Sequence, residues 1–158
     1  MTEQEYNERR DKYTLLCRQI SSLCEGEKDL IANMANTVSS IHLTMGFFWT
    51  GFYIVRGNEL VLGPFQGPSA CTRIPYGKGV CGTCMKEEKT IIVPDVEEFP
   101  GHIACSSLSK SEIVVPLYCD SQLIGVLDID STEKGTFSEV DAYCLEHICM
   151  LLGDSSRL

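Results

Sequence analysis

The hydrophobic residues of this chain change their period at Gly46, and this change limits the folds that the sequence can adopt. Before Gly46 they recur at helical spacing, which predicts one helix over about residues 2–24 and a second over about residues 28–45. After Gly46 the apolar segments are short, rich in β-branched and aromatic residues, and separated by glycine, proline and aspartate. Helices and strands are therefore segregated along the chain, which is typical of an α+β fold.

Two β-hairpins are predicted in the strand-like part. The first joins residues 47–55 to residues 59–63 through Arg56-Gly57-Asn58, and the second joins residues 113–117 to residues 123–130 through Asp120-Ser121. We expect a central antiparallel sheet of about six strands, flanked by the N-terminal helices and a C-terminal helix.

The last helix is predicted over about residues 137–152, with a capping box formed by Thr136 and Glu139. A chain of 158 residues is long enough to bury one core. We therefore expect a single domain over residues 1–158, with helices at about 2–45 and the sheet and active-site loops at about 47–131.

Charge, hydropathy and cysteine content restrict the classes of partner and the compartment that we expect. The 22 acidic and 13 basic residues give a net charge of −9, so a nucleic-acid partner is not expected. No apolar segment approaches the roughly 18 residues that suggest a membrane span. Nine cysteines is an odd number, which argues against a purely structural disulfide framework. We expect a cytoplasmic protein without a membrane partner.

Alternation along the strands places pairs of functional side chains on common faces. Trp49 and Tyr53 share a face with Phe47, as two core aromatics or as a ligand-facing pair. Asp128 and Asp130 are two residues apart and point to the same side of the sheet. Two such carboxylates repel unless a cation or a shared proton lies between them, although solvated acids at a strand end are the alternative.

A glycine-rich segment precedes a short helix predicted over about residues 80–87. Its Gly77-Lys78-Gly79 matches neither of the common phosphate-binding fingerprints. Cys81 lies in the first helical turn, where the helix dipole is expected to lower the thiol pKa. Cys84 has three possible roles, as a packed residue, a spare resolving thiol or half of a redox-active CxxC pair.

Seven segments together resemble one known family. The sequence is similar to the GAF-domain free methionine-(R)-sulfoxide reductases over about residues 28–152. The similarity rests on these segments: Trp49–Tyr53, Gly63–Gly67, Tyr76–Thr83, Val93–Val96, Pro100–Cys105, Ser111–Pro116 and Gly125–Ser131.

The resemblance implies a role for each site residue. Cys105 would be the nucleophile that attacks the sulfoxide sulfur and becomes a sulfenic acid, which Cys71 or Cys81 would resolve as a disulfide. Trp49 and Tyr53 would form the aromatic walls. The three acids would hold the substrate ammonium and polarise the sulfoxide, and these are Glu112, Asp128 and Asp130. His102 is expected only to shape its loop.

The resemblance also implies partners. A thioredoxin-like protein would reduce the disulfide, the chain would form a homodimer through its long helices, and neither a cofactor nor a metal would take part. The alternative function is a GAF module that binds a small ligand and signals without catalysis. A zinc site built from Cys71, Cys81, Cys84 and Cys105 is a further alternative, but this stretch contains only one closely spaced cysteine pair.

Overall fold

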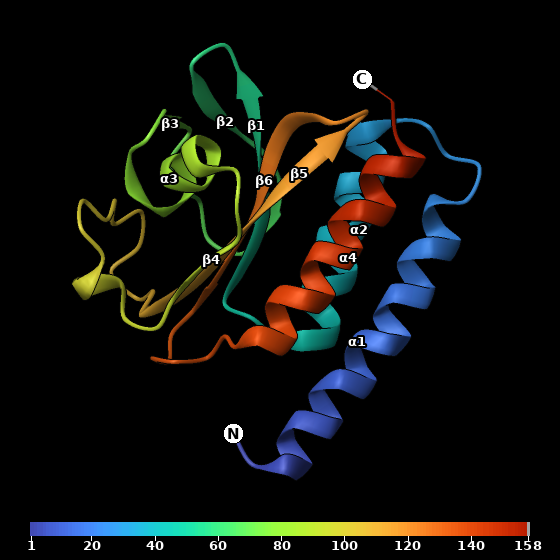
Figure 1. Ribbon diagram of the computed structural model, residues 1–158, viewed down its shortest axis with the longest axis horizontal. Helices are drawn as coiled ribbons and strands as arrows, with labels where there is room; N and C mark the ends of the chain where they lie inside the picture. Colours follow the sequence, from blue (N-terminus) through green and yellow to red (C-terminus); the bar gives the residue numbers. More distant parts are fainter. Residues whose placement is uncertain (158) are drawn as a thin grey trace.

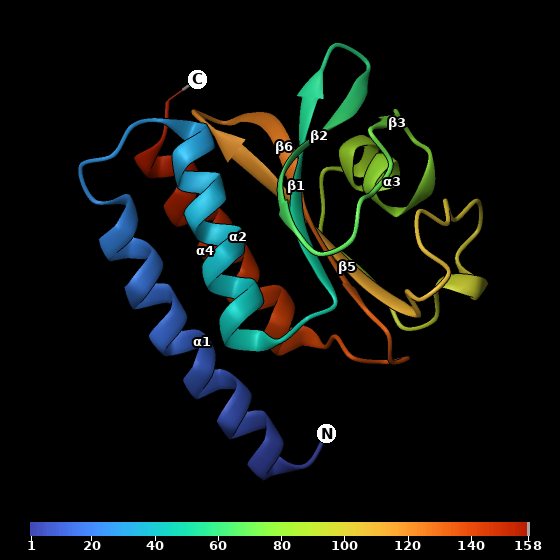
Figure 2. The ribbon, with the colours of Figure 1, turned by 180° about the vertical axis from the view of Figure 1, so that it is seen from behind.

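The fold has a six-stranded sheet with helices on one face and an irregular layer on the other (Figure 1). It is known from a computed structural model that describes residues 1–157. The helices α2 (Leu30–Met45) and α4 (Glu139–Ser155) lie on the sheet, and α1 (Glu3–Cys24) packs against both from outside. The short helix α3 (Gly79–Glu87) covers the opposite face, as the reverse view shows (Figure 2). The predicted α+β class is confirmed.

Every neighbouring pair of strands in the sheet is antiparallel, in the order β3-β2-β1-β6-β5-β4. Both predicted hairpins are present, and Asp120 and Ser121 adopt the positive φ angles of a tight hairpin turn, 51° and 64°. A three-residue 3₁₀ helix, Val96–Glu98, follows β4. The strand bounds are β1 Trp49–Arg56, β2 Glu59–Gln66, β3 Arg73–Pro75, β4 Ile91–Val93, β5 Ser111–Cys119 and β6 Gln122–Ser131.

The sheet separates two hydrophobic clusters. One faces the long helices and includes Ile20, Met34, Phe52, Leu127 and Leu145, and the other lies beneath α3 and includes Trp49 and Tyr53. Burial of this apolar surface on both faces is the main force that holds the layers together. Because the sheet separates the two clusters, a pocket on the α3 side does not interrupt the packing of the long helices.

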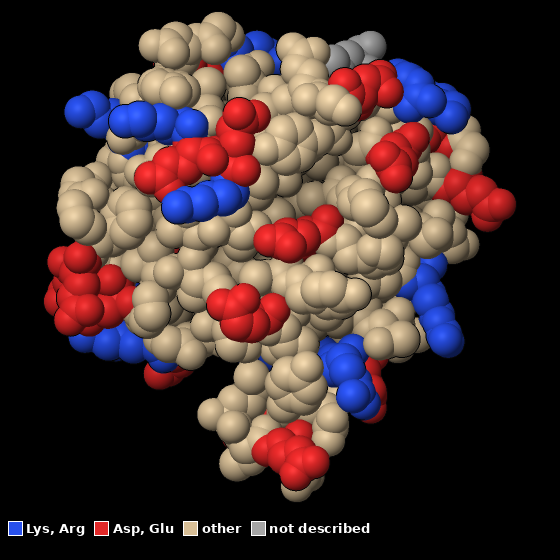
Figure 3. All heavy atoms as spheres, viewed as in Figure 1, with Lys and Arg blue, Asp and Glu red and all other residues tan. Residues whose placement is uncertain are grey.

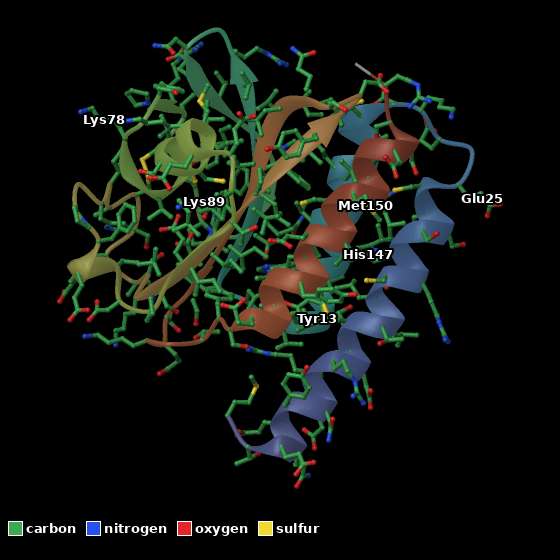
Figure 4. The ribbon with its side chains drawn as sticks, in the orientation of Figure 1. Tyr13, Glu25, Lys78, Lys89, His147 and Met150 are labelled. Carbon is green, nitrogen blue, oxygen red and sulfur yellow. A yellow bond between two sulfur atoms is a disulfide. The ribbon has the colours of Figure 1, made fainter. Side chains whose placement is uncertain are left out.

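A buried polar contact joins α1 to α4. Tyr13 donates a hydrogen bond of 2.7 Å to Asp141 Oδ1, and Arg9 forms an ion pair of 3.0 Å with Asp141 Oδ2. Tyr13 lies between the two helices (Figure 4). Asp141 is fully buried, so these partners replace the water that its carboxylate loses.

The beginning of α4 differs from the prediction. Its N-cap is Ser138, and the capping box is completed by Asp141 instead of by Thr136 and Glu139. Thr136 instead donates to Ser131 Oγ at 2.7 Å. The helix begins later than predicted and extends to Ser155; Cys149 on it is buried and Cys144 is half-buried.

The predicted alternation is also wrong at Phe47. Phe47 belongs to the helix-side cluster, whereas Phe48 packs against the cluster beneath α3. The reason is that β1 begins only at Trp49, so the period of two does not extend back through the bend at Phe48. Trp49 and Tyr53 share a face as expected.

The molecular surface carries charges of both signs. Acidic and basic side chains are interspersed on the face seen in Figure 3, and no broad basic area appears there. Within residues 1–157, none of the helices combines the length and the apolar character needed to cross a membrane.

Candidate active site

A pocket opens between the sheet, α3 and the loop of residues 99–110, on the face opposite α2 and α4. The space between its lining residues is about 590 Å³, part of which is open to solvent. Seven of the eight predicted site residues line it, and these are Trp49, Tyr53, Cys81, Cys105, Glu112, Asp128 and Asp130. The eighth, Cys71, is joined to Cys105 by a disulfide.

Strand register brings the three acids together. Glu112 on β5 is directly opposite Asp130 on β6, and Asp130 is in turn opposite Trp49 on β1. Asp128 lies two residues before Asp130 and therefore points to the same face. The acids thus occupy adjacent positions on the sheet that forms the pocket floor, although Glu112 is far from the other two in sequence.

The aromatic wall depends on a glycine. A Cβ on Gly51 would lie 2.4 Å from Cη2 of Trp49, so the indole ring lies directly over this position. The ring stacks on Tyr53 and Phe65 at centroid distances of 6.0 and 5.4 Å. Glycine at 51 therefore lets Trp49 fold along the strand and form an apolar surface beside the acids.

The same aromatic residues hold one of the two cysteine-bearing loops. Trp49 Nε1 donates to the carbonyl of Pro68 at 2.9 Å, and the Tyr53 hydroxyl donates to the carbonyl of Cys71 at 2.8 Å. The disulfide then connects this loop to Cys105, with 5.5 Å between the two Cα atoms. Cys105 is exposed at the pocket mouth, and Cys71 is half-buried.

Burial and mutual repulsion raise the pKa values of all three acids. The pKa of Glu112 is raised to about 8, first by burial and then by the charge of Asp130. Burial also raises the pKa of Asp128, with Glu112 adding to it, and the pKa of Asp130, with Asp128 adding to it. With a pKa of about 8, the Glu112 carboxyl retains its proton near neutral pH and is able to donate it.

Cys81 departs from the prediction. Burial raises the pKa of its thiol well above the ordinary value, and Asp128, Glu112 and Asp130 raise it further. The expected lowering by the α3 dipole is therefore wrong, because desolvation and three nearby carboxyl groups outweigh the dipole of a short helix. The Cys81 thiol instead points to Glu112 Oε1 at 3.9 Å.

The other cysteines lie in packed positions. Cys84 is fully buried, its thiol points to the Val114 carbonyl at 3.9 Å, and burial raises its pKa to about 12. Cys119 is also buried, with Sγ 3.4 Å from the Ser156 carbonyl oxygen. The position of Cys84 fits the packing role among the alternatives considered from the sequence.

His102 is a pocket residue that the sequence did not identify as such. Its Nε2 lies 3.6 Å from Glu112 Oε2, which is too long for a direct hydrogen bond but close enough for electrostatic contact. Burial lowers the His102 pKa. The only signal in the sequence was its position three residues before Cys105.

Comparison with known proteins agrees with this architecture. The sequence profile of the GAF domain family matches residues 29–155. The chain is 57% identical to GAF domain-containing protein A of Dictyostelium discoideum over 143 residues, which cover 90% of each chain. It is 45% identical to the free methionine-R-sulfoxide reductase of Escherichia coli over 137 residues, covering 86% of this chain and 83% of the relative.

A solved structure matches as well. The X-ray structure of free methionine-R-sulfoxide reductase from Neisseria meningitidis, in complex with its substrate, superimposes with a TM-score of 0.91 at 48% sequence identity. The match covers 93% of this chain and 89% of that one. The folds therefore agree over nearly their whole length.

Proposed function

The chain belongs to the GAF domain family and, within it, to the free methionine-R-sulfoxide reductases, and we propose that its pocket reduces free methionine-(R)-sulfoxide to methionine. The observation that carries this proposal is the Cys71–Cys105 disulfide at the mouth of a pocket whose floor consists of protonatable acids. A sulfoxide reductase needs a nucleophilic thiol, a proton donor and a second thiol. Cys105 and the acids line this pocket, and Cys71 is bonded to Cys105 at its mouth, which supports these three roles.

In the proposed chemical step, the thiolate of reduced Cys105 attacks the sulfoxide sulfur. A carboxyl of the acid cluster gives a proton to the sulfoxide oxygen, and the oxygen passes to Cys105 Sγ. The products are methionine and a Cys105 sulfenic acid, which is the first oxidation product of a cysteine thiol. Glu112 is well suited to the donor role, because its pKa is raised to about 8 and it stays protonated at neutral pH.

In the proposed second step, the Cys71 thiol attacks Cys105 Sγ and water leaves, so that the disulfide forms. A thioredoxin-like dithiol then supplies two electrons and two protons and restores both thiols. The exposure of Cys105 favours this exchange. The structure supports Cys71 as the resolving residue over Cys81, because Cys81 is buried with a raised pKa and thiolates are the attacking species.

The acids also account for the choice of a free amino acid. An ionised carboxylate among Glu112, Asp128 and Asp130 would pair with the substrate ammonium, a group that methionine within a polypeptide lacks. Trp49 and Tyr53 would pack against the methyl and sulfur end of the substrate, which favours an apolar surface. One pocket thus combines a cation-binding floor with an apolar wall.

The deciding experiment supplies each purified epimer of free methionine sulfoxide with dithiothreitol as reductant. We expect loss of the R epimer only, abolished in Cys105→Ser and retained in Cys84→Ser, which changes a buried cysteine outside the pocket lining. If neither epimer is consumed, the proposal fails, and ligand screening would test a sensory GAF module.

The expected homodimer has a separate test. Several helix side chains are apolar and exposed, among them Leu15, Leu43 and Tyr143. Such positions are compatible with association through the helical layer. Sedimentation velocity should show a dimer that Leu43→Glu or Tyr143→Glu weakens, and a monomer at all concentrations would refute it.

A further inference from the structure

A compact group of potential metal ligands lies on the pocket floor. One ligand atom each from Cys81, Glu112 and Asp128 lies within 4.8 Å of the others, and all three residues are buried. His102 Nε2 is close to the same group, at 3.6 Å from Glu112 Oε2. The residues come from α3, from two adjacent strands and from the loop of residues 99–110, so the tertiary fold alone assembles them.

One atom of this group lacks a partner. Asp128 is only 6% exposed, and its Oδ1 is buried without a hydrogen-bond partner in the described part of the chain. A buried carboxylate oxygen normally has a donor or a cation beside it, because its desolvation is costly. Asp128 is also one of the residues that line the pocket.

Within the described part of the chain, no lysine or arginine side chain fills this role. Over residues 1–157, neither lysine nor arginine forms an ion pair with Glu112, Asp128 or Asp130. Lys78 contributes to the pocket wall, but its side chain is exposed and extends away from the fold (Figure 4). The acid group is therefore arranged to receive a cation from outside the chain.

We propose that Cys81, Glu112 and Asp128 bind one divalent cation of the zinc class, and that this cation excludes the substrate. Zinc bonds of about 2.0–2.3 Å place ligand atoms about 3.3–3.7 Å apart in a tetrahedral site. The distance of 3.9 Å between Cys81 Sγ and Glu112 Oε1 is close to this requirement.

The donor set selects among cations. A thiolate among the ligands favours zinc, whereas magnesium and calcium prefer sites composed of oxygen ligands. Binding would displace the protons held by Cys81 and the acids, since metal ligands must be deprotonated. This set differs from the four-cysteine site considered from the sequence, because Cys71 and Cys105 are joined to each other.

Exclusion of the substrate by the bound cation rests on the proposed function. The substrate ammonium and the metal would use the same carboxylates, so each would displace the other. Zinc would then act as a competitive inhibitor that keeps the enzyme from turning over. Because Cys81 is free while the disulfide is intact, the oxidised enzyme retains the metal site.

Metal binding is tested first, on the oxidised full chain and without thiol reductants. We expect one zinc per chain by competition with a chromophoric chelator, and a sulfur-to-cobalt charge-transfer band when cobalt is added. Cys81→Ala should abolish the band and weaken zinc binding by more than about 100-fold, beyond the usual effect of an outer-shell substitution. Cys84→Ala, a buried cysteine in the same helix, should retain both.

Asp128→Asn gives an independent variant of nearly equal size, and circular dichroism checks that each variant is folded. It should weaken zinc binding while keeping the sulfur band at saturating cobalt. Equal zinc affinity and stoichiometry in wild type, Cys81→Ala and Asp128→Asn would overturn the inference, because the metal would then bind at other thiols. Absence of stoichiometric zinc binding to the wild type would overturn it as well.

Exclusion of the substrate is tested by a single turnover. Enzyme that has been reduced and freed of reductant receives methionine-(R)-sulfoxide with and without equimolar zinc, and methionine is quantified. We expect zinc to suppress methionine formation at least tenfold and a chelator to restore it. If bound zinc does not change the turnover, exclusion of the substrate is refuted. If the protein binds zinc but forms no methionine even without zinc, the proposed reductase activity is refuted and the metal site is not.

Discussion

Replacing Glu112 by glutamine tests the electrostatics of the acid cluster directly. The substitution preserves the size of the side chain and the acceptor that faces Cys81, and it removes a carboxyl group whose pKa is raised to about 8 from its ordinary value of 4.5. The folded state therefore binds a proton at pH values where the unfolded chain has already released it. Stability must then fall as the pH rises from about 4.5 to about 8 and level off above that.

The size of the effect follows from the same two pKa values. One pKa unit corresponds to about 1.4 kcal/mol, so Glu112 alone lowers the unfolding free energy by about 3–4 kcal/mol between pH 5 and pH 8. For a chain of this length, that loss corresponds to a decrease in Tm of about 10 °C. Asp128 and Asp130 act in the same direction, because their pKa values are also raised.

The assay is thermal and urea unfolding of the oxidised protein at several pH values, with a chelator present. We expect Glu112→Gln to be more stable than the wild type at pH 8 and to show a shallower decline from pH 5. Glu97→Gln, which changes an exposed glutamate on the 3₁₀ helix, should follow the wild-type profile. A wild-type profile that is flat over this range, or an unchanged slope in Glu112→Gln, would refute the raised pKa.

Three further predictions concern the disulfide loop and the packing. Cys71→Ser should form methionine in a single turnover and accumulate a Cys105 sulfenic acid that dimedone traps, and a full steady-state rate would exclude Cys71 as the resolving residue. Tyr53→Phe removes the 2.8 Å bond to the Cys71 carbonyl and should slow disulfide formation, measured by thiol counting, with about 1 kcal/mol lost in stability. An unchanged rate would contradict the role of this bond. Gly153→Ala places a Cβ 2.0 Å from the Tyr118 carbonyl oxygen, and urea unfolding should show a loss of about 1–3 kcal/mol, whereas wild-type stability would show that the contact relaxes.

Local patterns determined much of the fold. The two helices before Gly46, the hairpin turn at Asp120-Ser121 and the shared face of Asp128 and Asp130 all follow from periods of 3.6 and 2 residues and from turn chemistry. Each of these signals acts between residues near in sequence. For the same reason, the errors at Phe47 and at the start of α4 concern element boundaries, where one residue changes the face.

The environment of the site could be determined only from the tertiary structure. The sequence alone did not reveal that strand pairing sets Glu112 beside Asp130, that α3 buries Cys81 against the same acids, or that Cys71 is the cysteine bonded to Cys105. Similarity to a known family suggested the participants but left the choice between Cys71 and Cys81 open. Desolvation and charge repulsion depend on distances between segments far apart in the chain, and only the folded protein determines those distances.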